Sequence, residues 1–243
     1  MDTRSTPNGQ LSISVKRSLL FLALILFLAF ALRTYQLTAI PPGLTHDEAN
    51  HGREALGILD GVYLFYFPLN YGSEPLYSYT AALSMALFSE GLLALRLVNV
   101  IFGVAAIAIT YLWAARAFDR QTALLGAALT AVSFWPLATS RQALRAGMLP
   151  FFTATAVLFF WQIITTKPDF SARRRWMTAV AFGVSVAFTL HIYLAARVAW
   201  LMFPAFLLYL ALVQRDTFHR AWKPVLAGLL LTGLLVIPMF TYL

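Results

Sequence analysis

The residues of this sequence that could do chemistry are concentrated in one polar stretch, which begins Thr45-His46-Asp47-Glu48. This stretch opens a segment at about 40–91 that holds six of the chain's ten carboxylates, in an otherwise strongly apolar sequence. An adjacent Asp-Glu pair can accept a proton, bind a metal or anchor a cation. We therefore expect the chemistry of this protein to depend on Asp47 and Glu48.

A structural explanation competes for the same residues, because Thr45-x-x-Glu48 matches the capping box that starts a helix. Capping accounts for Thr45 and Glu48, but it leaves Asp47 with only a favourable interaction with the helix dipole. His46 and His51 could join Asp47 around a divalent cation, although their spacing matches no compact zinc motif. Both explanations stay open for this stretch.

The composition of the chain places it in a membrane. Of its 243 residues 60% are hydrophobic and only 12% are charged, and the mean hydropathy is +0.73. The net charge of +8 does not indicate nucleic acid, because the basic residues lie in short clusters between apolar runs, as in loops beside anionic lipid. The absence of cysteine excludes disulfides, thiolate nucleophiles and cysteine-bound metals. We therefore expect this protein to lie in membrane lipid and to bind no nucleic acid.

Seven apolar runs are long enough to cross a hydrocarbon core about 30 Å thick, whereas the stretch 76–88 is shorter and predicts an interfacial or re-entrant helix. With the N-terminus inside, the inner segments hold twelve basic and four acidic residues and the outer segments six of each, which satisfies the positive-inside rule. The sequence thus predicts an all-α polytopic membrane protein with a cytoplasmic tail at 1–17, a membrane module at 18–243 and a large first outer loop at about 40–91. The predicted spans are 18–38, 92–114, 121–139, 147–165, 176–194, 196–213 and 224–243.

Aromatic residues and arginines flank the predicted site. The segment 63–79 carries seven aromatic residues, which predict either a belt at the membrane interface or the wall of a sugar or isoprenoid site. Arg141 and Arg145 are one helical turn apart, so we expect them to share a helix face and bind phosphate oxygens; snorkelling at a helix end is the alternative. For Arg197 we expect snorkelling.

Two other polar residues of the apolar regions have structural interpretations. Arg96 lies in the second predicted span and is expected to pair with Glu90 or Glu74, which precede this span in the sequence. His191 is expected to form a hydrogen bond within the helix bundle, although a histidine inside a membrane can also relay protons.

The order of these elements resembles the polyprenyl-phosphate-dependent glycosyltransferases of the GT-C fold. The resemblance is to the branch that contains protein O-mannosyltransferases and lipid A aminoarabinose transferases, and it covers nearly the whole chain after residue 18. The segments that carry it are His46-Asp-Glu-Ala49, Asn70-Tyr-Gly-Ser-Glu-Pro-Leu76, Leu95-Arg96-Leu97 and Ser140-Arg141-x-x-x-Arg145.

The resemblance implies an enzyme of the bacterial inner membrane that moves a sugar from a polyprenyl-phosphate donor to a hydroxyl acceptor at the outer face. It makes Asp47 the catalytic base or the residue that aligns the acceptor, with Glu48 as its partner. It leaves a divalent cation possible and implies no other cofactor. The implied substrate-binding residues are Arg141, Arg145, Arg96, Glu74 and Tyr71.

The sequence departs from this family in two ways. The aminoarabinose-transferase branch has an arginine soon after its Asp-Glu pair and a lysine in a Glu-Lys-Pro motif, where this sequence has Asn50 and Ser73-Glu74-Pro75. Family members usually continue with further helices, so we expect this chain either to be inactive in isolation or to be completed by a protein partner that covers the last helix, on which Gly228 and Gly233 allow close approach. The alternative function is therefore a non-catalytic GT-C-like subunit of a larger complex. A transporter is disfavoured, because the acidic residues lie almost entirely in loops.

Overall fold

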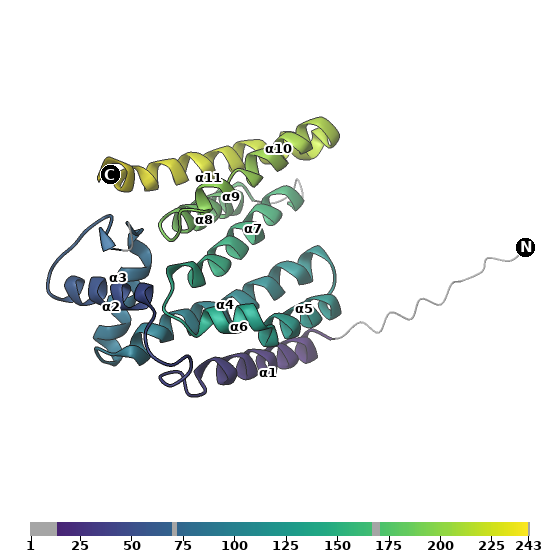
Figure 1. Cartoon of the computed structure of the whole chain (residues 1–243). Helices are drawn as coiled ribbons and strands as arrows, with labels where there is room; N and C mark the ends of the chain where they lie inside the picture. The colour runs from purple at the N-terminus through teal and green to yellow at the C-terminus, as the bar shows by residue number, and fades with distance from the viewer. Residues whose placement is uncertain (1–13, 70–71, 167–170, 243) are drawn as a thin grey trace, which may run out of the picture.

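The protein is a bundle of helices, and two helices of 14 residues each, His46–Leu59 and Pro75–Phe88, pack at one end of it (Figure 1). The computed structural model describes residues 14–69, 72–166 and 171–242, so Tyr71 lies outside the described residues. Within those ranges the secondary structure is helical apart from an isolated β-bridge between Phe67 and Ser73, which confirms the all-α prediction.

The elements follow one another with short connections, except for the segment between α1 and α4. The helices are α1 (Val15–Thr34), α2 (His46–Leu59), α3 (Pro75–Phe88), α4 (Leu92–Ala117), α5 (Arg120–Val132), α6 (Phe134–Ser140), η2 (Arg145–Met148), α7 (Leu149–Thr165), α8 (Ala172–Leu190), α9 (Ala196–Ala199), α10 (Met202–Val213) and α11 (Arg215–Tyr242).

Several helix starts are set by polar side chains in the sequence. The Asp119 carboxylate accepts hydrogen bonds from the first backbone N–H groups of α5, and Ser14 and Ser171 cap α1 and α8 in the same way. Pro75 occupies the first position of α3, where the missing N–H group costs nothing. The long helices α1, α4 and α7 are largely apolar and show no strong amphipathic pattern.

Five helical segments of the described chain are long and apolar enough to cross a membrane, and a sixth is formed if α5 and α6, bent by 58° at their junction, make one span. The prediction of seven spans is therefore not met by these criteria. The difference is the predicted span 176–194, which falls on α8. Every 18-residue stretch of α8 includes Arg173, Arg174 and Arg175, so α8 does not qualify by composition. The helix α3, at the stretch 76–88, is also outside this set, as predicted.

Two contacts bring the backbones of α8 and α11 close together. Gly183 of α8 and Gly228 of α11 lie so close that a Cβ atom on Gly183 would meet the Gly228 carbonyl oxygen at 2.3 Å. Thr232 of α11 donates a hydrogen bond to the Gly183 carbonyl oxygen (2.8 Å). Gly228 thus serves packing inside this chain, whereas a Cβ atom on Gly233 would meet nothing within 4 Å.

A buried arginine joins the first helix to the middle of the bundle. Arg33, at the end of α1, donates from Nη1 to the carbonyl oxygen of Ala131 in α5 (2.9 Å) and from Nε to the hydroxyl of Ser140 in α6 (3.2 Å). Its side chain is fully buried. This arginine fixes the end of α1 from which the segment carrying the predicted site departs.

Candidate active site

The start of α2 is built as the sequence predicts, with a complete capping box. The Thr45 hydroxyl accepts from the Glu48 backbone N–H (3.3 Å), and the Glu48 carboxylate accepts from the Thr45 backbone N–H (3.0 Å). The capping interpretation is thus confirmed for Thr45 and Glu48.

Glu48 has a second role, because its carboxylate is the centre of a buried network. Arg96 of α4 donates to it from Nε (2.9 Å) and Nη2 (3.3 Å), and the backbone N–H of Ala143 donates to Oε1 (2.8 Å). Both side chains of the Glu48–Arg96 pair are fully buried. The predicted pairing of Arg96 with Glu90 or Glu74 is therefore wrong, and the carboxylate of Glu48, which was predicted to be catalytic, is fully buried in this structure.

The network sets the charge state of Glu48. Burial would by itself raise the pKa of this carboxyl group, but the hydrogen bonds from Arg96, Thr45 and Ala143 outweigh it, and the pKa is lowered. Glu48 is thus held ionised beside a permanent cation.

Arg96 also holds the backbone that leads into α2. Its Nη1 and Nη2 groups each face carbonyl oxygens of the segment 37–43. The acceptors are Leu37 (2.9 Å), Pro41 (2.9 Å) and Gly43 (2.7 Å). A guanidinium that satisfies a carboxylate and three carbonyls has no donor left for a substrate phosphate.

Arg141, which was predicted to bind phosphate, has the same kind of structural role. Its two terminal nitrogens face backbone carbonyls at the end of α1 and in the turn that follows. The short contacts are to Leu32 (2.7 Å), Arg33 (3.0 Å), Tyr35 (2.6 Å) and Ile40 (2.9 Å). The prediction that Arg141 and Arg145 share a helix face is also wrong, because α6 ends at Ser140 and Arg145 begins the separate helix η2.

Asp47 stands apart from these networks. It lies in the first turn of α2, its side chain is exposed, and its carboxylate has no hydrogen-bond or ion-pair partner among the described residues. Its backbone is fixed on both sides, by the capping box and by the buried Glu48–Arg96 pair. The result is a free carboxylate presented by a rigid frame.

Arg145 and Arg197 meet at one carboxylate, that of Glu74. Arg145 Nη1 lies 2.8 Å from Glu74 Oε2, and Arg197 Nη2 lies 3.5 Å from Glu74 Oε1. Arg145 also donates to the Gly72 carbonyl oxygen (3.0 Å), and its guanidinium lies 5.5 Å from the ring centroid of Tyr193. The prediction that Arg197 merely snorkels is therefore wrong.

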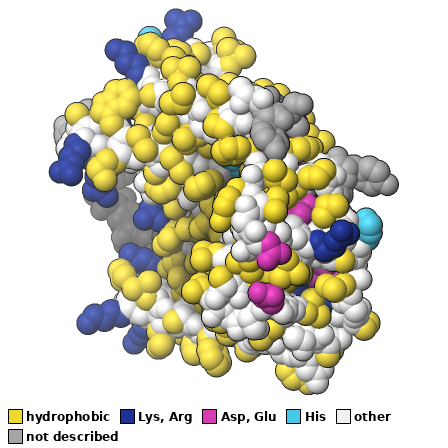
Figure 2. Space-filling model, turned by 90° about the vertical axis from the view of Figure 1, so that its left-hand side faces the viewer, with side chains coloured by type: hydrophobic (Ala, Val, Ile, Leu, Met, Phe, Trp, Pro, Cys, Tyr) yellow, Lys and Arg dark blue, Asp and Glu magenta, His cyan; other side chains and the backbone are white. Residues whose placement is uncertain are grey.

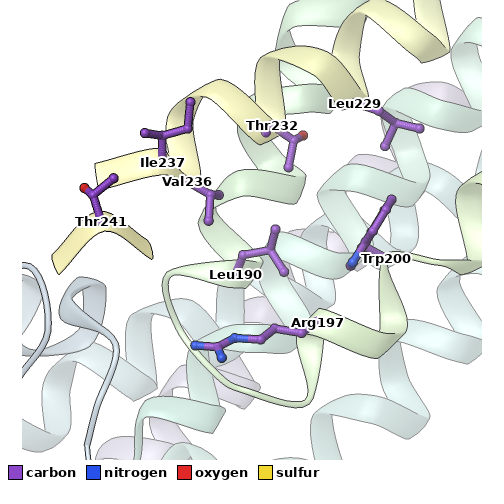
Figure 3. A pocket seen from close by; sticks show the side chains of 9 residues that line it. Leu190, Arg197, Trp200, Leu229, Thr232, Val236, Ile237 and Thr241 are labelled. Atoms are coloured by element: carbon purple, nitrogen blue, oxygen red, sulfur yellow. The ribbon is translucent and has the colours of Figure 1, made fainter. Parts of the chain in front are cut away.

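An apolar cavity of about 510 Å³ adjoins this ion-pair cluster. Figure 3 shows Arg197 at one side of the cavity, with Leu190, Trp200 and the side chains of α11 forming the other walls. Apart from Arg197 the lining is almost entirely apolar. A cavity with a guanidinium at its rim fits a molecule that has an anionic head and a hydrocarbon tail.

A further buried cluster, which sequence reasoning did not single out, joins α2 to α3. The Glu54 carboxylate accepts from the hydroxyls of Ser73 (2.9 Å) and Ser78 (2.5 Å), and it lies 3.0 Å from His51 Nδ1. Only the i,i+3 spacing of His51 and Glu54 signalled this contact in the sequence. Among the described residues no group of three or more His, Asp or Glu could hold a metal, and the divalent cation stays a prediction.

His191 lies near the same end of the bundle and has the hydrogen bond that was predicted for it. Its Nε2 donates to the Leu235 carbonyl oxygen of α11 (3.2 Å), and its own carbonyl oxygen accepts from the Leu76 backbone N–H (3.1 Å). These bonds connect α8, α11 and the start of α3.

The predicted site residues of the described chain lie at the end of the bundle that carries α2 and α3 (Figure 1). Figure 2 looks onto this end, where the visible acidic side chains gather on one side of a largely apolar surface. Basic residues at the starts of α1, α5, α8 and α11 lie at the opposite end of the bundle.

Comparison with known proteins agrees with this architecture. The sequence model of the dolichyl-phosphate-mannose-protein mannosyltransferases matches residues 72–242. The chain belongs to this family. Among curated proteins none matches the sequence.

Solved structures that share the fold include the following three. One is an oligosaccharyltransferase of Archaeoglobus fulgidus in its apo form, with a TM-score of 0.78 and 17% identity, covering 93% of this chain and 30% of that chain. The second is ArnT of Cupriavidus metallidurans bound to undecaprenyl phosphate, with a TM-score of 0.69 and 20% identity, covering 94% of this chain and 41% of that chain. The third is the Pmt1-Pmt2 protein O-mannosyltransferase complex of S. cerevisiae bound to its sugar donor, with a TM-score of 0.71 and 17% identity, covering 95% of this chain and 34% of that chain.

These matches bear on fold and family. At such identities the similarity shows the GT-C fold, and the family match together with the apolar helices makes the chain an integral membrane protein. The chain spans about 30% to 41% of the length of these three proteins.

Proposed function

We propose that this chain carries the acceptor-activating and donor-binding residues of a membrane glycosyltransferase that moves a sugar from a polyprenyl-phosphate carrier to a hydroxyl group. The family match supports this reaction class. The observation that carries the assignment is Asp47, an exposed carboxylate without a partner among the described residues, held beside a fully buried ion pair.

Asp47 is the general base in this proposal. The acceptor oxygen attacks the anomeric carbon and its proton moves to the Asp47 carboxylate, while the bond from that carbon to the phosphate oxygen breaks. The electron pair of the broken bond leaves with the lipid phosphate. One displacement of this kind inverts the anomeric configuration. Glu48 and Arg96 are positioning residues, because they fix the backbone of Asp47 without reaching the substrate.

Arg145 and Arg197 are the phosphate ligands in this proposal, in place of the predicted pair Arg141 and Arg145. Their guanidinium groups are part-exposed and share the Glu74 carboxylate, and Arg197 lines the apolar cavity. The terminal nitrogens of Arg141 and Arg96, by contrast, face backbone carbonyls or Glu48. Guanidinium suits phosphate because its N–H groups match two oxygens at once. The cavity then takes the first isoprene units of the carrier.

The proposed orientation places the α2–α3 end outside the bacterial inner membrane and the N-terminus in the cytoplasm. The described basic residues of the opposite end support this, since cytoplasmic loops carry an excess of lysine and arginine. Among them are Lys16, Arg17, Arg116, Arg120, Arg173, Arg174, Arg175, Arg215, Arg220 and Lys223.

The experiment is a transfer assay with the protein reconstituted in lipid nanodiscs. A panel of synthetic polyprenyl-phosphate sugars is supplied together with an alcohol as the hydroxyl acceptor, and release of polyprenyl phosphate is followed by mass spectrometry. Donor binding is measured separately, without the acceptor. We expect release with at least one donor, weaker donor binding in Arg145→Ala and Arg197→Ala, and normal binding in the control Arg53→Ala, an exposed arginine of α2. Binding of donor that is equal in all four proteins would contradict the phosphate assignment.

A further inference from the structure

Glu74 lies where an incoming phosphate would have to bind. Its carboxylate joins two guanidinium groups from separate elements, Arg145 of η2 at 2.8 Å and Arg197 of α9 at 3.5 Å. The Glu74 side chain is only 3% exposed, so water contributes little to its stabilisation. A carboxylate and a phosphodiester both offer charged oxygens to guanidinium N–H donors, and they compete for the same ones.

The local structure shows that Glu74 is not in this position to cap its helix. It is the residue before the first turn of α3, yet its side chain makes no capping hydrogen bond. Its carboxylate faces the two arginines instead of the backbone N–H groups of α3. The helix start still offers an alternative position: Pro75 has no N–H group and the Leu76 N–H donates to the His191 carbonyl oxygen, but the positive end of the helix dipole favours a negative charge there.

The two halves of the Arg145–Glu74–Arg197 cluster differ in strength. Arg145 is also held by the Gly72 carbonyl oxygen and lies over the Tyr193 ring, so it is well fixed. The contact from Glu74 to Arg197, at 3.5 Å, is longer than an ideal charge-assisted hydrogen bond. Arg197 is also the member of the cluster that lines the apolar cavity. An anion that enters from the cavity thus meets the weaker contact first.

We propose that Glu74 is an internal competitor for the donor phosphate: its carboxylate occupies the arginine pair in the donor-free protein and leaves when the carrier phosphate enters. This role rests on the proposed function, because it requires a phosphate-bearing donor at Arg145 and Arg197. The carboxylate keeps two part-exposed guanidinium groups compensated while the site is unloaded, and the start of α3 receives it when the site is loaded. The apparent Kd for the donor is the intrinsic Kd divided by the fraction of protein in which Glu74 has left the arginine pair.

The test measures binding of undecaprenyl phosphate, without a sugar, to the reconstituted protein and to Glu74→Gln. The amide keeps the shape of the side chain and removes its charge. If the unoccupied site makes up about one tenth of the molecules, Glu74→Gln binds about tenfold more tightly. Glu90→Gln is the matched control, since Glu90 is an exposed carboxylate of the same outer segment, and its affinity should equal that of the wild type.

Weaker or unchanged binding in Glu74→Gln would overturn the competitor role, since it would make Glu74 either a group that positions the arginines or an irrelevant one. Glu74→Asp covers the case in which the amide variant does not fold, because its shorter side chain keeps the charge but cannot reach both guanidinium groups. It should bind more tightly than the wild type, and equal or weaker binding overturns the role. A wild-type protein that binds no undecaprenyl phosphate overturns the proposed function as well, whereas a reversed order of affinities overturns only the role of Glu74.

Discussion

Removing the charge of Glu48 is the change whose effect on stability follows most directly from the structure. In Glu48→Gln the guanidinium of Arg96 stays buried without its carboxylate, and a neutral amide with one oxygen replaces a carboxylate that accepts four hydrogen bonds. Breaking a buried ion pair by removing one partner costs about 3–5 kcal/mol. A chain of this size loses about 2–4 °C of Tm for each kcal/mol, so we expect a fall of roughly 6–20 °C.

The assay is thermal unfolding of the purified protein in mild detergent, followed by intrinsic tryptophan fluorescence. Asp60→Asn is the control, because Asp60 is an exposed carboxylate at the other end of α2. Its Tm should stay close to that of the wild type. A Glu48→Gln protein that unfolds within about 1 °C of the wild type would refute the structural role of the Glu48–Arg96 pair, since even an average hydrogen bond contributes about 1 kcal/mol.

The pH dependence of stability has a sign that follows from the same pair. The pKa of Glu48 is lowered in the folded protein, so the ionised carboxylate stabilises the fold at every pH above the ordinary glutamate pKa. This stabilisation is lost as the pH falls through the pKa that Glu48 has in the folded protein. We expect the Tm of the wild type to fall on acidification by more than that of Glu48→Gln. Equal acid sensitivity in the two proteins would mean that the network does not favour the ionised carboxylate.

Two further predictions concern packing and topology. Gly183→Ala should destabilise the protein by about 1–3 kcal/mol, because its Cβ atom would meet the Gly228 carbonyl oxygen at 2.3 Å. The control Gly126→Ala should be neutral or stabilising, because its Cβ atom would meet nothing within 4 Å. Equal Tm changes in the two variants would contradict this packing of α8 on α11. In this cysteine-free chain, Ser89→Cys should label with an impermeant thiol reagent from outside the cell, and Ser171→Cys should not. Labelling of Ser171→Cys from outside would reverse the proposed orientation.

Local sequence patterns predicted local structure well. Thr45 and Glu48 form the capping box, the stretch 76–88 became α3, and the first apolar run became α1, because these features depend on neighbouring residues and on composition. The bend between α5 and α6 and the polar start of α8 were missed, since a hydropathy pattern does not show where a long apolar run changes direction. Element existence was therefore more predictable than the number of spans.

The partners of the charged residues could not be predicted, because they depend on the tertiary fold. Arg96 pairs with Glu48, which is 48 positions away, and Arg197 reaches Glu74 across 123 positions. Arg141 and Arg145 looked like one helix face, but the chain breaks its helix between them. A burial pattern could not have distinguished these cases, since an arginine in an apolar run can bind a carboxylate, backbone carbonyls or a ligand.

The central claim is that Asp47 accepts the proton of the acceptor hydroxyl, and single-turnover transfer by Asp47→Asn tests it most directly. The amide keeps the size of the side chain and removes its basicity, so with saturating donor the rate should fall roughly 10²-fold or more, as expected for loss of a general base. The affinity for undecaprenyl phosphate and the Tm should match those of the wild type, since the Asp47 side chain is exposed and lies outside the Glu48–Arg96 network. Transfer by Asp47→Asn at the wild-type rate would contradict the claim and leave Asp47 as a residue of the helix start alone.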